Sequence, residues 1–109
     1  MSPPPVACDI EAILPADRPR YRSLRERLFR LVEHVAEIPD GYALRIRDDG
    51  DTLLMLAEWI AFERLCCRFL RFVVTVDGGD RLDLTLSGDA GVKEFLRLEL
   101  AGGALAPRE

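Results

Sequence analysis

Residues 69–86 read FLRFVVTVDGGDRLDLTL, and this stretch decides the fold class. Its first half is rich in β-branched and aromatic side chains, which favour a strand over residues 68–76. Residues 77–80, Asp-Gly-Gly-Asp, are typical of a hairpin turn. Leu82, Leu84 and Leu86 then alternate with polar residues, as expected for a half-buried returning strand. The stretch therefore predicts an antiparallel hairpin.

Upstream of the hairpin, the periodicity of apolar residues predicts two helices and one more strand. Asp17 can cap a first helix whose apolar stripe runs from Tyr21 to about Glu37. Residues 42–47 alternate like a half-buried strand, and a second helix is expected from Leu53 to about Cys66.

Downstream, Val92, Phe95 and Leu96 predict a last short helix. The expected order is helix, strand, helix, strand, strand, helix. This order predicts one α+β domain over residues 6–101, with a small, mainly antiparallel sheet and helices packed on one face. Residues 1–5 and 102–109 are predicted to be flexible tails because they are rich in Pro, Gly and Ala.

The composition excludes two broad classes of function. The formal net charge is −4, from 15 basic and 19 acidic residues, which argues against electrostatic binding of nucleic acid. No apolar run reaches the roughly 18 residues of a membrane span. The first residues have neither a basic start nor an apolar segment, so we expect a cytoplasmic protein without a signal peptide. In that reducing compartment, three cysteines are expected to be free thiols or metal ligands.

The most distinctive motif is the segment Glu63-Arg64-Leu65-Cys66-Cys67 at the end of the second helix. Glu63 lies three and four residues before the two thiols, so the three side chains can converge on one side of the last turn. A thiolate pair suits soft or borderline ions such as Hg(II), As(III), Cu(I), Cd(II) or Zn(II). Cys8 is the third candidate ligand, and Glu63 or a water could complete a zinc site. A shared ion requires the Cys8 sulfur to lie within about 4–5 Å of Cys66 or Cys67.

Other readings of the same residues stay open. Glu63 could form a buried ion pair with Arg45 or Arg71, and the cysteines could simply pack in the core. A thiol oxidoreductase would use Cys66 or Cys67 as the attacking thiol and Cys8 as the resolving one. A third class is a non-catalytic dimeric interaction protein. The leading hypothesis is a small metal-binding protein for sequestration or hand-off of a soft ion, and enzymatic activity is not expected.

The second helix also predicts an interface. Residues 53–65 are apolar on nearly every side, interrupted by Glu58, Glu63 and Arg64. A helix of this kind is buried on both sides or covered by a partner. With one small sheet available to cover it, we expect a homodimer through residues 53–65.

Four segments resemble a group of small, largely uncharacterised bacterial proteins with a Glu-Arg-x-Cys-Cys element. The segments begin at Cys8 (Cys-Asp-Ile), Pro39 (Pro-Asp-Gly-Tyr), Glu63 (Glu-Arg-Leu-Cys-Cys) and Gly91 (Gly-Val-Lys-Glu-Phe-Leu). Such proteins are associated with heavy-metal resistance, mercury especially, so the resemblance implies a thiol-based role with soft metals. Arg68 follows the cysteine pair where the group carries a proline or an acidic residue.

Overall fold

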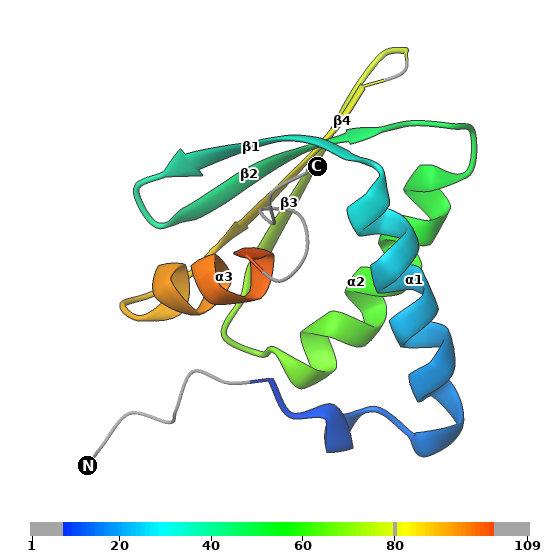
Figure 1. Cartoon of the computed structure of the whole chain (residues 1–109), viewed down its shortest axis with the longest axis vertical. Helices are drawn as coiled ribbons and strands as arrows, with labels where there is room; N and C mark the ends of the chain where they lie inside the picture. The colour runs from blue at the N-terminus through cyan, green and yellow to red at the C-terminus, as the bar shows by residue number, and fades with distance from the viewer. Residues whose placement is uncertain (1–7, 80, 102–109) are drawn as a thin grey trace.

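A computed structural model of the chain describes residues 8–79 and 81–101 (Figure 1). Two short 3-10 turns, η1 and η2, precede three α-helices and four strands. Their bounds are η1 Ile10–Ala12, η2 Pro15–Asp17, α1 Arg18–Arg30, β1 Val32–Ile38, β2 Gly41–Arg47, α2 Thr52–Cys66, β3 Arg71–Asp77, β4 Arg81–Ser87 and α3 Val92–Ala101. The predicted tails, 1–5 and 102–109, lie outside the described residues.

The four strands form one antiparallel sheet in the order β1-β2-β4-β3. Leu44 of β2 lies opposite Leu84 of β4, which in turn lies opposite Val74 of β3. Alternate residues of the two central strands are buried, whereas Arg45 and Arg47 of β2 are exposed. The helices pack on one face of the sheet (Figure 1). The predicted α+β class and the antiparallel hairpin of β3 and β4 are therefore confirmed.

The predicted order of elements is wrong at one place. The first helix was expected to continue to Glu37, but α1 ends at Arg30 and residues 32–38 form β1. The observed order is helix, β, β, helix, β, β, helix. Val32 and Val35 fit helical spacing equally well, but their branched side chains pack readily in a sheet. Pro39 disfavours helix at the preceding residue, and pairing with β2 satisfies the backbone of β1 instead.

Helix α2 buries one face and exposes the other. The buried side chains are Thr52, Met55, Leu56, Trp59, Glu63 and Cys66. Leu54 is 75% exposed, and Leu53 and Leu65 are each 40% exposed. Burial on both sides is therefore not achieved within one chain, and the homodimer through residues 53–65 stays a prediction. Within the described ranges, no helix has the length and apolarity needed to cross a bilayer.

Candidate metal centre

A backbone hydrogen bond holds the N-terminal arm, residues 8–14, against the end of α2. The Asp9 N–H donates a hydrogen bond to the Cys66 carbonyl at 2.9 Å. The Asp9 side chain caps η1 by accepting from the Glu11 N–H at 3.2 Å. These two bonds place Cys8 beside the C-terminus of α2, although 54 residues separate Asp9 from Glu63 in the sequence.

The end of α2 directs its two thiols differently. Cys66 is the last helical residue, whereas Cys67 leaves the helix with φ −118° and ψ 69°. The Cys67 N–H still donates to the Glu63 carbonyl at 2.7 Å, so the chain turns within one residue. This change of direction brings the side chains of both cysteines next to the Glu63 carboxylate.

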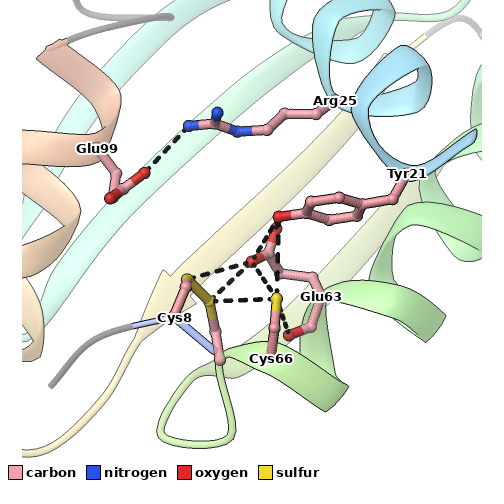
Figure 2. The surroundings of a disulfide bond; sticks show 7 residues. Cys8, Tyr21, Arg25, Glu63, Cys66 and Glu99 are labelled. Atoms are coloured by element: carbon pink, nitrogen blue, oxygen red, sulfur yellow. Dashed lines mark hydrogen bonds and ion pairs between the residues drawn. A yellow bond between two sulfur atoms is a disulfide. The ribbon is translucent and has the colours of Figure 1, made fainter. Parts of the chain in front are cut away.

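The three sulfurs and the carboxylate form one compact cluster, which we call the thiol–carboxylate cluster (Cys8, Glu63, Cys66 and Cys67). Their ligand atoms all lie within 4.8 Å of one another (Figure 2). Cys8 and Cys67 form a disulfide with a Cα–Cα distance of 4.8 Å, and Cys66 is a buried free thiol. The expectation that the Cys8 sulfur lies next to the cysteine pair is confirmed. The leading hypothesis did not include the disulfide, because a reducing compartment favours free thiols. A pairing of Cys8 with Cys66 or Cys67 belonged to the alternative, a thiol oxidoreductase.

Glu63 is the centre of this cluster. Its Oε1 lies 2.8 Å from the sulfur of Cys67, 3.5 Å from that of Cys66 and 3.7 Å from that of Cys8. The sulfurs of Cys66 and Cys67 are 3.8 Å apart. Four potential ligand atoms from two distant segments therefore lie close together.

Tyr21 of α1 completes the surroundings of the carboxylate. Its hydroxyl donates to Glu63 Oε2 at 3.0 Å and lies 3.3 Å from Oε1. The Tyr21 hydroxyl oxygen accepts from the Cys66 thiol at 3.9 Å (Figure 2). The sequence placed Tyr21 only in the apolar stripe of the first helix. No spacing signal links it to Glu63, because 42 residues separate them.

The alternative interpretation of Glu63, a buried ion pair with Arg45 or Arg71, is wrong. Arg45 instead pairs with Asp83 at 3.5 Å on the sheet, and no ion pair of Glu63 occurs within the described residues. Glu63 is only 5% exposed. The carboxyl is therefore buried among thiols and a phenol with no basic side chain in contact.

Burial favours the protonated form of every titratable group in this cluster. It raises the pKa of Glu63, and this effect is opposed by hydrogen bonds from Tyr21 and Cys66 and by the more distant charge of Arg25. Burial and then the negative charge of Glu63 raise the pKa of the Cys66 thiol to about 11. Burial followed by the same charge raises the pKa of Tyr21. A cation that replaced these protons would remove the cost of burying the anions.

Two of the distances in the cluster match the spacing of ligands around one metal ion. Ligands around a tetrahedral ion at about 2.3 Å lie about 3.8 Å from each other. The Cys66–Cys67 sulfur distance of 3.8 Å and the Cys66–Glu63 distance of 3.5 Å are close to that value. The sulfurs of Cys8 and Cys67 can take up this spacing only after their disulfide has been reduced, which takes two electrons and two protons.

No protein-family model matches the chain, and no curated protein or solved structure matches it either. The class of protein is therefore defined by the fold and the site alone. It is an α+β protein whose N-terminal arm and α2 together form a thiol–carboxylate cluster that could hold a metal ion.

Proposed function

We propose that the reduced protein binds one soft or borderline metal or metalloid ion through Cys8, Cys66 and Cys67. The candidate ions are Hg(II), As(III), Cu(I), Cd(II) and Zn(II). Glu63 is either the fourth ligand or the neighbour that orients the thiols. The observation that carries this proposal is the convergence of the four ligand atoms within 4.8 Å of one another.

Core packing alone does not account for this arrangement. A buried carboxylate without a basic partner is costly, and a sequence selected only for packing would have an apolar side chain in its place. Glu63 lies on the buried face of α2 and contacts all three sulfurs. A bound cation supplies the positive charge that the surrounding side chains lack.

The different exposure of the three cysteine residues favours sequestration with hand-off. Cys66 and Cys67 are 3% and 1% exposed, whereas Cys8 is exposed at the surface. A carrier thiolate in the cytoplasm would therefore meet Cys8 first, and exchange would pass the ion inward to the buried pair. The step is ligand exchange between thiolates and involves no change of oxidation state.

The second candidate function is thiol–disulfide exchange, favoured by the Cys8–Cys67 disulfide. Cys67 rather than Cys66 would be the redox partner of Cys8. An attacking thiol requires a lowered pKa, whereas burial raises the pKa of Cys66. The third candidate, a dimeric interaction protein whose cysteines only pack, predicts neither metal binding nor reversible oxidation.

One titration separates these candidates. Fully reduced protein is titrated with Zn(II), Hg(II) and As(III) while the free thiols are counted. A metal site protects two or three thiols per chain, and Cys66→Ser or Cys67→Ser abolishes this protection because the remaining ligands lose their shared ordering. A redox protein instead forms the Cys8–Cys67 disulfide in mild peroxide without metal protection.

Glu63→Gln tests the carboxylate separately from the thiols. We expect it to weaken zinc binding by about 10-fold or more, as loss of a metal ligand or its orienting group does. Glu58→Gln is the matched control, because Glu58 lies on the same helix but pairs with Arg20 at the surface, 2.7 Å away. If no metal protects any thiol while both serine variants stay folded, the metal proposal is wrong.

A further inference from the structure

A cavity of about 470 Å³ opens beside the thiol–carboxylate cluster. Cys8, Tyr21 and Glu63 line the end that it shares with the cluster. Small-molecule pockets typically measure about 300–1,000 Å³, whereas a bare ion needs only the space between its ligands. A naked metal ion would therefore leave almost all of this cavity unfilled.

More than half of the residues that line the cavity have apolar or aromatic side chains. They include Phe29, Trp59, Leu70, Phe95 and Leu96, contributed by all three helices and the turn after α2. Trp59 is 3% exposed and packs edge-on against Phe29 with ring centroids 6.5 Å apart. Its indole N–H is buried without a hydrogen-bond partner in the described part of the chain. Such walls favour an aromatic group, which can pack against the surrounding rings.

Besides Glu63, four charged residues line the cavity. They are two arginines and two glutamates, Arg22, Arg25, Glu26 and Glu99. Arg25 pairs with Glu99 at 3.1 Å, as Figure 2 shows beyond the cluster, and its guanidinium lies 5.0 Å from the Phe29 ring centre. Glu26 pairs with Arg30 at 3.8 Å, whereas Arg22 forms no ion pair within the described residues. The part of a ligand that lies against the apolar walls is expected to be uncharged, because burial of a charge there without a partner is costly.

We propose that the ligand of this site is a soft metal or metalloid atom that carries one aryl group, with the metal on the thiols and the ring in the cavity. The inference rests on the proposed metal-binding function and names the substrate class of that same site. A trivalent aryl arsenical is the simplest member of this class, because arsenic binds thiols and keeps its carbon substituent.

Binding would proceed without redox chemistry at arsenic. An arylarsonous acid, which carries two hydroxyl groups, reacts with the reduced thiols of Cys8 and Cys67. Two As–S bonds form, two As–O bonds break, and each hydroxide leaves as water with one thiol proton. Cys8 lines the cavity, and the Cα atom of Cys67 lies 4.8 Å from that of Cys8. The As–C bond stays intact and directs the ring between Trp59 and Phe95.

The test compares methylarsonous and phenylarsonous acid by calorimetry on the reduced full-length chain. Both probes make the same two As–S bonds, so a difference in affinity reports the organic group. The ratio of phenyl to methyl affinity is measured for the protein and divided by the same ratio for a free dithiol. We expect this corrected ratio to be about 10 to 100, because the ring leaves water for an apolar cavity. The fluorescence of Trp59, the single tryptophan, should change with the phenyl probe and not with arsenite.

A cavity-filling variant locates the effect. Ile10 lines the cavity and is 37% exposed, so Ile10→Trp should remove most of the phenyl preference without disturbing the core. Leu14→Trp is the matched control, since Leu14 lies on the same arm, is 70% exposed and is not among the cavity residues. Arsenite and zinc should bind both variants as they bind the original chain.

Equal affinity for the two probes, or an unchanged Trp59 signal, would overturn the aryl proposal. If arsenite and zinc still protect thiols in that case, the metal-binding function stands and only the substrate class is wrong. If neither the inorganic ions nor the arsenicals bind, the proposed function itself fails. Phenyl selectivity that persists in a folded Ile10→Trp variant would also contradict the assignment of the ring to this cavity.

Discussion

Reduction of the Cys8–Cys67 disulfide should destabilise the fold by an amount that follows from its position. The bond joins residues separated by 59 positions. Chain entropy predicts that a loop of this length contributes ~4 kcal/mol, and strain or residual structure in the unfolded chain lowers the usual yield to ~2–4 kcal/mol. A domain of this size has a total stability of ~5–15 kcal/mol, so the loss is a large fraction. We expect the midpoint of thermal unfolding to fall by about 10–15 °C.

The assay is urea unfolding followed by the fluorescence of buried Trp59, on oxidised, reduced and reduced zinc-loaded protein. Zinc should recover much of the loss, because an ion shared by Cys8 and the end of α2 joins the same two segments and binds only the folded state. Cys8→Ser should abolish the difference between oxidised and reduced protein. Cys66→Ser is the control that keeps it, since Cys66 is a free thiol.

Three outcomes would refute this reasoning. Oxidised and reduced protein could unfold at the same urea concentration, which would mean that the arm is not stapled to α2. Cys66→Ser could remove the redox dependence, which would assign the disulfide to the wrong thiol. Zinc could leave the stability of the reduced protein unchanged and yet raise the stability of the Cys8→Ser variant. That result would show that Cys8 is not a zinc ligand.

Three further changes have definite expected outcomes. Burial raises the pKa of Glu63, so its contribution to stability is present at acidic pH and is lost as the pH rises through the folded-state pKa; reduced Glu63→Gln, unlike Glu58→Gln, should lose less stability between acidic and neutral pH in urea unfolding. Leu54 is 75% exposed on α2, and Leu54→Glu should convert the expected dimer to a monomer in sedimentation analysis; a chain that is already monomeric would contradict the dimer. A Cβ on Gly41 would overlap the backbone of β4, so Gly41→Ala should cost ~1–3 kcal/mol in urea unfolding, whereas Gly78→Ala, with open space around it, should not.

Local patterns were sufficient for much of the fold. Alternation in residues 42–47 and 82–86 marked two strands that lie in the middle of the sheet, where one face is buried and the other is solvated. The same rule failed for β1, which lies at the edge of the sheet. Only Val32 of this strand is buried, so its apolar residues do not alternate. Partners in the neighbouring strand decided its conformation.

The candidate site, too, was predictable from the sequence only in part. The sequence by itself determined that Glu63, Cys66 and Cys67 share one end of α2, because three- and four-residue spacing is a property of any helix. Only the tertiary structure decided that Cys8 joins them through the Asp9–Cys66 backbone bond, and that the carboxyl is met by Tyr21 instead of an arginine. The cavity likewise exists only once three helices have packed. Contacts between distant segments depend on how whole elements pack, and the spacing of residues along one element carries no information about that packing.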